Sequence, residues 1–515
     1  MKKYVIGIDV GTTGTKAMVI DLKGTNLGSS YRDYPFVQPQ QNWVELEADN
    51  LLDQVFTVTR ESVEKSGVDP AEIAAVSFSV QRSSVLLVDE EGKALENRIM
   101  VWLDTRADEV LPQMDDIMDP DYRSEITGMP SNAIFGQEKL YWWKEKRPDL
   151  WNKARYISTV DGYAMKAFGT EDYRIDVSSA QTAGLIDVRN MGWNYEILDA
   201  MGMDRDKFPK LAEPGQVVGH VSEAAAARTG LTTDTLIVVG AGDQQAGALG
   251  AGVIDNGDVS ITIGTGGFVI VGVSEPKFRE FKGLMVSTTP NIGVFEVEGN
   301  QNSGATCYRW AKETFCDLEE VVAKNTGMDP FDLMGKMVEE SSRPGSNGVI
   351  FSAGLFGTGY PTWNSTASGA FIGLRDNNSK ADILRSVMEG VTLEARFMLE
   401  SVRETGVHTK PIITITGGAT KSPIWKQIMA DVMGVTCRTL DVTDAPLIGV
   451  AGLAAYGAGL FKSKSEIVEN MVHFKEEIQP IPENVEIYNK IFNIYKKFYY
   501  AMNDSGIYDD LTKIY

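Results

Sequence analysis

Small polar and charged residues suited to phosphate binding surround the end of the first apolar run. Asp9 lies within that run, the turn Gly11-Thr12-Thr13-Gly14 follows it, and Lys16 begins the next apolar run. A turn of glycines and threonines exposes backbone N–H groups and hydroxyls without bulky side chains. A lysine and a carboxylate beside such a turn suit a nucleotide phosphate chain with its magnesium ion. The pattern predicts a β-hairpin whose tip binds phosphate, although the glycines could also serve the turn alone.

A second hairpin of the same kind is predicted near the middle of the chain. The β-prone run 258–263 enters Gly264-Thr265-Gly266-Gly267, and the apolar run 268–272 follows. Two Gly-Thr hairpins about half a chain apart indicate a duplicated domain. Two such tips facing each other could hold a phosphate chain from both sides, and the pair is far more specific than either hairpin alone.

Asp243 is the strongest candidate for acid–base chemistry. It follows the predicted strand 236–239 and Gly240-Ala241-Gly242, and it opens a predicted helix of small residues together with Gln244 and Gln245. An aspartate at a helix N-terminus can be purely structural. The paired glutamines and the close glycine packing favour a functional site instead.

Polar residues at the ends of two more predicted strands are candidates for a substrate site. Gln81 and Arg82 follow the predicted strand 73–80, and Trp102 and Asp104 follow the next apolar run. Ligands of open α/β sheets bind beyond strand ends, so these side chains are predicted to face the substrate. Core packing is the alternative for the tryptophan.

A third glycine turn is predicted in the last quarter of the chain. The strand 412–416 leads into Gly417-Gly418-Ala419, and Ser422 precedes a helix predicted over 424–433. A turn without side chains between a strand and a helix leaves a flat surface, which suits an adenine and a ribose.

The elements that must position these residues alternate between strands and helices, which is typical of an α/β protein. Helices are predicted over 49–65, 136–165 and 380–404, and the segment 176–187 is predicted to be a polar loop that leads into a short strand. The uncharged stretch 445–461 is rich in Ala and Gly and is interpreted as a buried helix. Because 515 residues exceed one ordinary core, two large domains are expected.

The composition excludes several other classes of function. The chain has 49 Lys and Arg residues against 71 Asp and Glu residues, a net charge of −22, which disfavours nucleic acid and anionic membranes as partners. Three His and three Cys residues are too few and too dispersed for a zinc cluster or a disulfide framework. The N-terminus runs directly into the first strand without a signal peptide, so a cytoplasmic location is expected.

In this order along the chain, the motifs resemble those of the FGGY carbohydrate kinases, which belong to the actin-like ATPase superfamily. The resemblance extends over nearly the whole chain. It implies an α/β fold of two ribonuclease-H-like domains around a cleft. Residues 1–249 would bind sugar and phosphate and supply the catalytic base, and residues 250–515 would supply the second phosphate loop and the adenosine site. A P-loop is excluded because no G-x-x-x-x-G-K-[ST] motif is present.

The resemblance implies a role for each motif residue. Asp243 matches the general base, and Asp9 matches the carboxylate that organises Mg²⁺. The implied substrate-binding residues are Gln81, Arg82, Trp102, Asp104 and Gln244. The implied nucleotide-binding residues are Gly11, Thr12, Thr13, Lys16, Gly264, Thr265, Gly266, Gly417, Gly418, Ala419 and Ser422.

The resemblance further implies a kinase that uses ATP and Mg²⁺ to phosphorylate a small sugar or polyol. Gln81-Arg82-Ser83 differs from the Gln-Met-His usual in xylulose kinases and from the Gln-Arg-Glu usual in glycerol kinases, whereas Trp102-Leu103-Asp104-Thr105-Arg106 is closer to the xylulose kinase pattern. A xylulose-like pentulose is therefore the expected acceptor. A glycerol- or erythritol-type polyol, gluconate and autoinducer-2 are the alternatives.

A nucleotide-driven switch of the actin-like superfamily is the alternative outside metabolism, because fold alone does not fix function. Apart from the small-molecule substrate, neither nucleic acid nor membrane is expected as a partner. The sequence leaves open whether the chain forms a homodimer.

Overall fold

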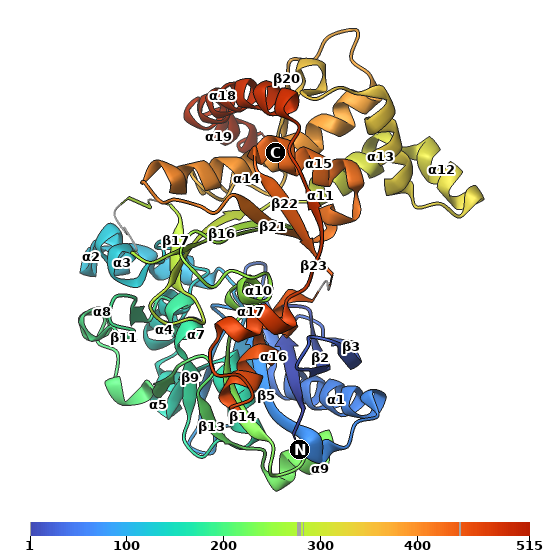
Figure 1. The fold of residues 1–515 in the computed structure, drawn as a ribbon. Coiled ribbons are helices and arrows are strands. Elements are labelled where there is room, and N and C mark those ends of the chain that lie inside the picture. Colours follow the sequence, from blue (N-terminus) through green and yellow to red (C-terminus); the bar gives the residue numbers. More distant parts are fainter. Residues whose placement is uncertain (1, 276–279, 282, 442–443, 515) are drawn as a thin grey trace. The chain divides into compact units, whose positions relative to one another are not determined.

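The computed structural model describes residues 2–275, 280–281, 283–441 and 444–514 and forms two compact units (Figure 1). Unit 1 comprises Met1–Ile254, Val286–Glu296 and Asp444–His473, and unit 2 comprises Asp255–Met285, Val297–Thr443 and Phe474–Tyr515. A single division near residue 250 would assign the later segments Val286–Glu296 and Asp444–His473 to the second half of the chain. In the structure these two segments belong to unit 1.

Unit 1 is built on a six-stranded sheet with the strand order β13-β14-β5-β1-β2-β3. The central strands β1, β5 and β14 are parallel to one another, and the outer pairs are antiparallel. All eight residues of β5 are buried, as expected for a strand covered on both faces. The strands are β1 (Tyr4–Val10), β2 (Gly14–Asp21), β3 (Asn26–Asp33), β5 (Ile73–Val80), β13 (Val217–His220) and β14 (Leu236–Gly242).

Helices α1 (Ala48–Ser66), α10 (Asp243–Gly250) and α16 (Ala445–Gly457) pack in unit 1 against this sheet or against each other. Helix α16 approaches β1 so closely that a Cβ atom on Gly7 would lie 2.6 Å from the Leu447 carbonyl oxygen. The interpretation of the stretch 445–461 as a buried helix is therefore confirmed for α16. No helix among the described residues is long and apolar enough to cross a membrane.

A second sheet in unit 1, of four strands, has the order β4-β7-β6-β8. The single helix predicted over 136–165 is wrong, because β8 separates α6 from α5 and Pro148 begins α5 as a new helix. The polar loop predicted within 176–187 is also wrong, since α7 forms there, whereas the short strand predicted at its end is confirmed by β10. The elements are β4 (Glu45–Glu47), β6 (Val85–Val88), β7 (Arg98–Met100), β8 (Tyr156–Thr159), α4 (Gly136–Lys146), α5 (Pro148–Lys153), α6 (Val160–Phe168) and α7 (Val177–Thr182).

Unit 2 repeats the strand order of the large sheet of unit 1. Six strands of its seven-stranded sheet run in the order β18-β16-β15-β21-β22-β23. Strands β15, β21 and β22 are parallel, and β16 and β23 pair antiparallel with β15 and β22. The internal repeat predicted from the two glycine hairpins is thus confirmed. The strands are β15 (Val259–Ile263), β16 (Gly267–Val273), β18 (Phe295–Gln301), β21 (Ile412–Thr416), β22 (Thr436–Leu440) and β23 (Phe474–Ile478).

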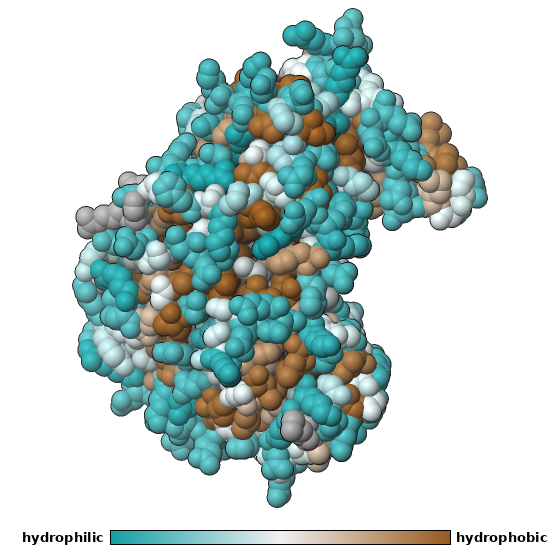
Figure 2. All heavy atoms as spheres, viewed as in Figure 1, coloured by the Kyte–Doolittle hydropathy of each residue, from teal (hydrophilic) through white to brown (hydrophobic). Residues whose placement is uncertain are grey.

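Helix α14 (Lys380–Glu404) has the predicted bounds and begins with a capping box between Ser379 and Asp382. Helix α12 (Asp317–Thr326) exposes apolar side chains such as Leu318 and Val321. Figure 2 shows hydrophobic surface where Figure 1 draws this helix. The other long helices are α11 (Thr306–Phe315), α13 (Pro330–Ser341), α15 (Pro423–Met433) and α18 (Pro482–Asp504).

The remaining elements are short. Among residues 2–254 they are α2 (Leu111–Ile117), α3 (Pro120–Thr127), α8 (Tyr195–Ala200), α9 (Glu223–Thr229), β9 (Arg174–Asp176), β10 (Ile186–Asp187), β11 (Gly192–Trp193) and β12 (Lys210–Ala212). In the later part of the chain they are β17 (Met285–Thr288), β19 (Ile350–Ser352), β20 (Ala370–Ile372), α17 (Ser465–Met471) and α19 (Ile507–Thr512).

Candidate active site

The first glycine turn forms the tip between β1 and β2, as predicted. The Gly11 N–H donates to the Gly14 carbonyl at 3.0 Å, and the Tyr34 N–H donates to the Thr13 carbonyl at 3.1 Å. The tip is therefore fixed by its own backbone and by its neighbour Tyr34. Thr13 is exposed, and Thr12 Oγ1 accepts a hydrogen bond from the Trp102 indole N–H at 2.9 Å.

Asp9 lies on β1 beside the tip, and the parallel pairing with β5 places Ser79 opposite it. The Ser79 hydroxyl donates to Asp9 Oδ1 at 2.7 Å. The pKa of Asp9 is raised to about 7, mainly by burial and also by the nearby carboxylates of Asp243 and Asp444, while Ser79 and Lys16 act in the opposite direction. Three aspartates and a lysine therefore interact at this corner of unit 1.

Asp444 also lies at this corner, and sequence reasoning missed it. Its Oδ1 forms a 2.8 Å ion pair with Lys16 Nζ, and both side chains are partly exposed. Asp444 directly precedes α16, 428 residues after Lys16, and no motif marks it in the sequence. Only the packing of α16 on β1 brings the two residues together.

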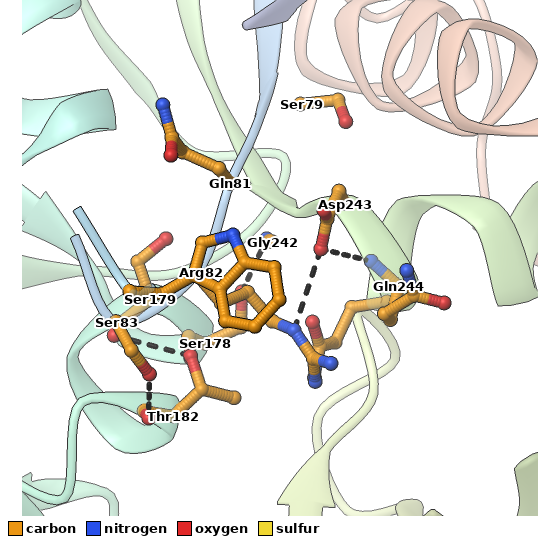
Figure 3. A network of polar contacts seen from close by, with 12 residues as sticks. Ser79, Gln81, Arg82, Ser83, Ser178, Ser179, Thr182, Gly242, Asp243 and Gln244 are labelled. Atoms are coloured by element: carbon orange, nitrogen blue, oxygen red, sulfur yellow. Dashed lines mark hydrogen bonds and ion pairs between the residues drawn. The ribbon is translucent and has the colours of Figure 1, made fainter. Parts of the chain in front are cut away.

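Asp243 is the first residue of α10, where the N-terminal backbone N–H groups favour a negative charge. The Asp243 Oδ1 atom accepts the Gln244 N–H at 2.8 Å and lies 3.3 Å from Arg82 Nε (Figure 3). A Cβ atom on Gly242 would lie 2.5 Å from Gln245 Oε1 and 2.8 Å from Arg82 Cγ. A glycine before Asp243 thus lets Arg82 reach the carboxylate, and the structure brings these two predicted residues together.

Gln81 and Trp102 are both hydrogen-bonded to the tip between β1 and β2. The Gln81 amide donates to the Gly11 carbonyl at 3.2 Å and accepts from the Ser84 hydroxyl at 3.0 Å. The backbone N–H of Trp102 donates to the Ser84 hydroxyl oxygen at 3.1 Å. Gln81 is only 2% exposed, whereas Trp102 is 36% exposed. Of these two side chains, Trp102 is therefore the more accessible to a substrate. A substrate contact of Gln81 stays a prediction.

Asp104 faces the protein interior. Its carboxylate has no exposed surface and accepts hydrogen bonds from Arg106 Nη2 at 2.6 Å and from the Val44 N–H at 2.6 Å. Arg106 also contacts Glu45 at 2.6 Å, and its guanidinium lies 3.7 Å from the centre of the Trp43 ring. A substrate would have to displace Arg106 to reach this carboxylate, and the substrate contact of Asp104 stays a prediction. The sequence shows that Asp104 follows a strand, but it does not show that Arg106, two residues later, pairs with it.

The second glycine turn lies between β15 and β16 in unit 2. The Gly264 N–H donates to the Gly266 carbonyl at 2.9 Å, and the N–H groups of Gly304 and Ala305 donate to the Thr265 and Gly264 carbonyls at 2.9 and 2.7 Å. The Thr265 side chain is exposed at the tip. The backbone carbonyls of this tip are thus held by the segment that leads into α11, which leaves its outer surface for a ligand.

The third glycine turn lies beside the second one. Gly417 has a φ of 88°, and a Cβ atom on it would lie 2.5 Å from the Ile263 carbonyl oxygen at the end of β15. Gly417 and Gly418 are exposed, Ala419 is buried, and Ser422 caps α15 by accepting the Trp425 N–H at 3.4 Å. Unit 2 therefore offers an exposed, side-chain-free surface next to its phosphate-type tip.

These arrangements define a class of protein. Two sheets of the same strand order, each with a Gly-Thr hairpin, form the fold of the actin-like ATPases. Family models for the FGGY family of carbohydrate kinases match residues 4–250 with the N-terminal domain and residues 259–458 with the C-terminal domain. The chain belongs to the FGGY family, and it is a carbohydrate kinase that transfers phosphate from ATP to a small sugar or polyol.

Known relatives differ in the sugar that their names give. The chain is 29% identical to the xylulose kinase of Bacillus subtilis (strain 168), over 98% of each chain. It is 27% identical to the gluconokinase of Bacillus licheniformis, over 96% of this chain and 95% of that protein. The solved structure of a gluconate kinase from Lactobacillus acidophilus has a TM-score of 0.89 and 25% identity, over 97% of this chain and 98% of the other.

Proposed function

We propose that the protein transfers the γ-phosphoryl group of ATP to a hydroxyl of a xylulose-like pentulose, with Asp243 as the general base. The observation that carries this proposal is the Asp243 carboxylate at the start of α10. It is partly exposed, and Arg82 and the Gln244 N–H hold it in one orientation. A carboxylate fixed in this way can align a sugar hydroxyl and accept its proton as the oxygen attacks phosphorus.

The nucleotide residues would act mainly by position and charge, because phosphoryl transfer requires little covalent chemistry from the protein. We propose that the tip at Thr12 and Thr13 and the Lys16 ammonium bind phosphate oxygens. In unit 2, Thr265 at the tip would bind phosphate oxygens, and the exposed surface at Gly418 would bind the adenosine.

We propose that Asp9 organises the magnesium ion. Among the described residues no group of three or more His, Cys, Asp or Glu side chains is arranged to hold a metal. Mg²⁺ commonly binds through one or two carboxylates, several waters and substrate phosphates, so one carboxylate beside a phosphate-binding tip fits this ion. The bound ion would neutralise charge on the β- and γ-phosphate oxygens.

The xylulose kinase relative and the exposed Trp102 support a pentulose as the acceptor. An aldonate such as gluconate is the second candidate. Two observations favour it: the Arg82 cation beside Asp243, which could also pair with a substrate carboxylate, and the gluconokinase relatives.

The test is a coupled ADP-release assay with a panel of pentuloses, polyols and aldonates. We expect one acceptor class to have much the highest kcat/KM. The variant Asp243→Asn should lower kcat by about 10²–10⁴-fold while it still binds ATP, which a fluorescent nucleotide titration measures. Near wild-type turnover of Asp243→Asn would contradict the base assignment. ATP hydrolysis that no acceptor stimulates would instead favour an actin-like switch.

A further inference from the structure

Helix α7 joins the segment that carries Arg82 to the segment that carries Asp243. Near its N-terminus the Ser178 hydroxyl oxygen accepts the Gly242 N–H at 3.0 Å. At its C-terminus the Thr182 carbonyl accepts the Ser83 hydroxyl at 2.6 Å. Figure 3 shows both contacts, from Gly242 to Ser178 and from Ser83 to Thr182. Gly242 and Ser83 are the immediate chain neighbours of Asp243 and Arg82.

The buried Asp176 carboxylate orients the Ser178 hydroxyl, and Asp161 holds the Asp176 backbone. Ser178 donates its proton to Asp176 Oδ2, so its lone pairs are left for the Gly242 N–H. The Asp176 N–H donates to Asp161 Oδ2 at 2.7 Å. Ser178, Asp176 and Asp161 are all at most 2% exposed, so water does not compete for these groups and the direction of the serine hydroxyl is fixed.

The start of α10 depends on a contact from outside the helix. Its N-cap residue is Gly242, which has no capping side chain, and the Asp243 carboxylate accepts the Gln244 N–H in the first turn. The Gly242 N–H is buried, and a buried donor without an acceptor is costly. Ser178 supplies that acceptor one residue before Asp243.

We propose that Ser178 is a positioning residue for Asp243, fixing the β14–α10 junction so that the carboxylate points to the acceptor hydroxyl. This inference rests on the proposed role of Asp243 as the base. Ser178 accepts the Gly242 N–H, so its effect on Asp243 would pass through the Gly242 backbone. The alternative is a serine that only satisfies its own hydrogen bonds in the core.

The adjacent Ser179 provides a matched control. Its hydroxyl also donates to Asp176 Oδ2, at 3.1 Å, and it is 1% exposed, but its hydroxyl has no described contact with Gly242. We expect Ser178→Ala to lower kcat about 10–100-fold with the KM for ATP unchanged. Ser179→Ala should stay within about threefold of wild type, because it leaves the junction intact.

Two further variants make the test independent of folding. Ser178→Thr keeps the hydroxyl and should restore most of the lost turnover. Ser178→Cys keeps the size with a weaker acceptor and should lie between the alanine variant and wild type. If Ser178→Ala does not fold, the kcat values of Ser178→Thr and Ser178→Cys test the proposal instead. A higher kcat for the threonine variant would support it, and equal kcat values would overturn it.

A double-variant cycle separates this proposal from the proposed function. If Ser178 acts through Asp243, adding Ser178→Ala to Asp243→Asn should cause almost no further loss in single-turnover rate. Equal losses in the Ser178→Ala and Ser179→Ala variants, or a full additional loss in the double variant, would overturn the positioning role. Near wild-type turnover of Asp243→Asn alone would instead overturn the base assignment, whatever the serine variants do.

Discussion

Replacing Glu394 by glutamine should change how the stability of unit 2 depends on pH. Glu394 lies on α14 and is 2% exposed. Its carboxylate accepts a hydrogen bond from the Gln301 side-chain amide at 3.4 Å. The pKa of Glu394 is raised from an ordinary value of 4.5 to about 8, because the effect of burial exceeds the opposing effect of the Gln301 hydrogen bond. Glu394→Gln keeps the shape of the side chain and removes its titration.

The sign follows from proton binding. Between the ordinary pKa and the raised one, the folded state keeps a proton on Glu394 that the unfolded state has lost. The free energy of unfolding must therefore fall as pH rises through this window. One pKa unit corresponds to about 1.4 kcal/mol, so the loss from about pH 5 to about pH 8 should be roughly 3–4 kcal/mol. Glu394→Gln should lack this loss and should become more stable than wild type as pH rises.

Amide hydrogen exchange within α14 measures the local free energy of unfolding, so the test does not require both units to unfold together. We expect protection of α14 in Glu394→Gln to exceed that in wild type increasingly toward about pH 8, after correction for intrinsic exchange. Glu404→Gln makes the same chemical change at the exposed end of the same helix and controls for the loss of one formal charge. The same pH dependence in wild type and Glu394→Gln would refute the reasoning.

Two further predictions concern the active site. Gly242→Ala should lower kcat at least about tenfold, because the added Cβ would lie 2.5 Å from Gln245 Oε1 and 2.8 Å from Arg82 Cγ; an unchanged kcat in steady-state assays would contradict this role of the close approach. Lys16→Met should raise the KM for ATP about tenfold through loss of a charge-assisted hydrogen bond and leave the KM for the acceptor unchanged. An increase in the KM for the acceptor alone would contradict the proposed contact between Lys16 and the ATP phosphates.

The glycine hairpins could be predicted from the sequence because their conformation is determined locally. Gly11 and Gly264 each begin a tip that a backbone hydrogen bond closes within three residues, and the flanking runs are apolar and β-prone. The long helix α14 was predicted with its observed bounds for a similar reason. Its capping box and its apolar periodicity lie within the segment itself.

Short elements were predicted less well, since their signals are weak. Strand β8 has four residues and α7 has six, and neither length shows a clear period. The cap of α7 is Asp176, whose carboxylate accepts the N–H groups of Ser178 and Ser179. An aspartate before two serines occurs equally in polar turns, so the sequence 176–187 reads as a loop until its packing is known.

The aspartates of unit 1 show why motif position alone cannot assign chemistry. Asp104 is neutralised by Arg106 two residues later and has no exposed surface, whereas Asp243 meets Arg82 from 161 residues earlier and remains partly exposed. Asp444 is held by Lys16, a contact that exists only because α16 packs on β1. Each carboxylate has a cationic partner, so charge pairing does not distinguish them. Access distinguishes Asp104 from the other two, because a carboxylate must be partly exposed to receive a proton from a substrate. Asp243 and Asp444 both remain partly exposed, and this difference in burial is decided by the tertiary fold.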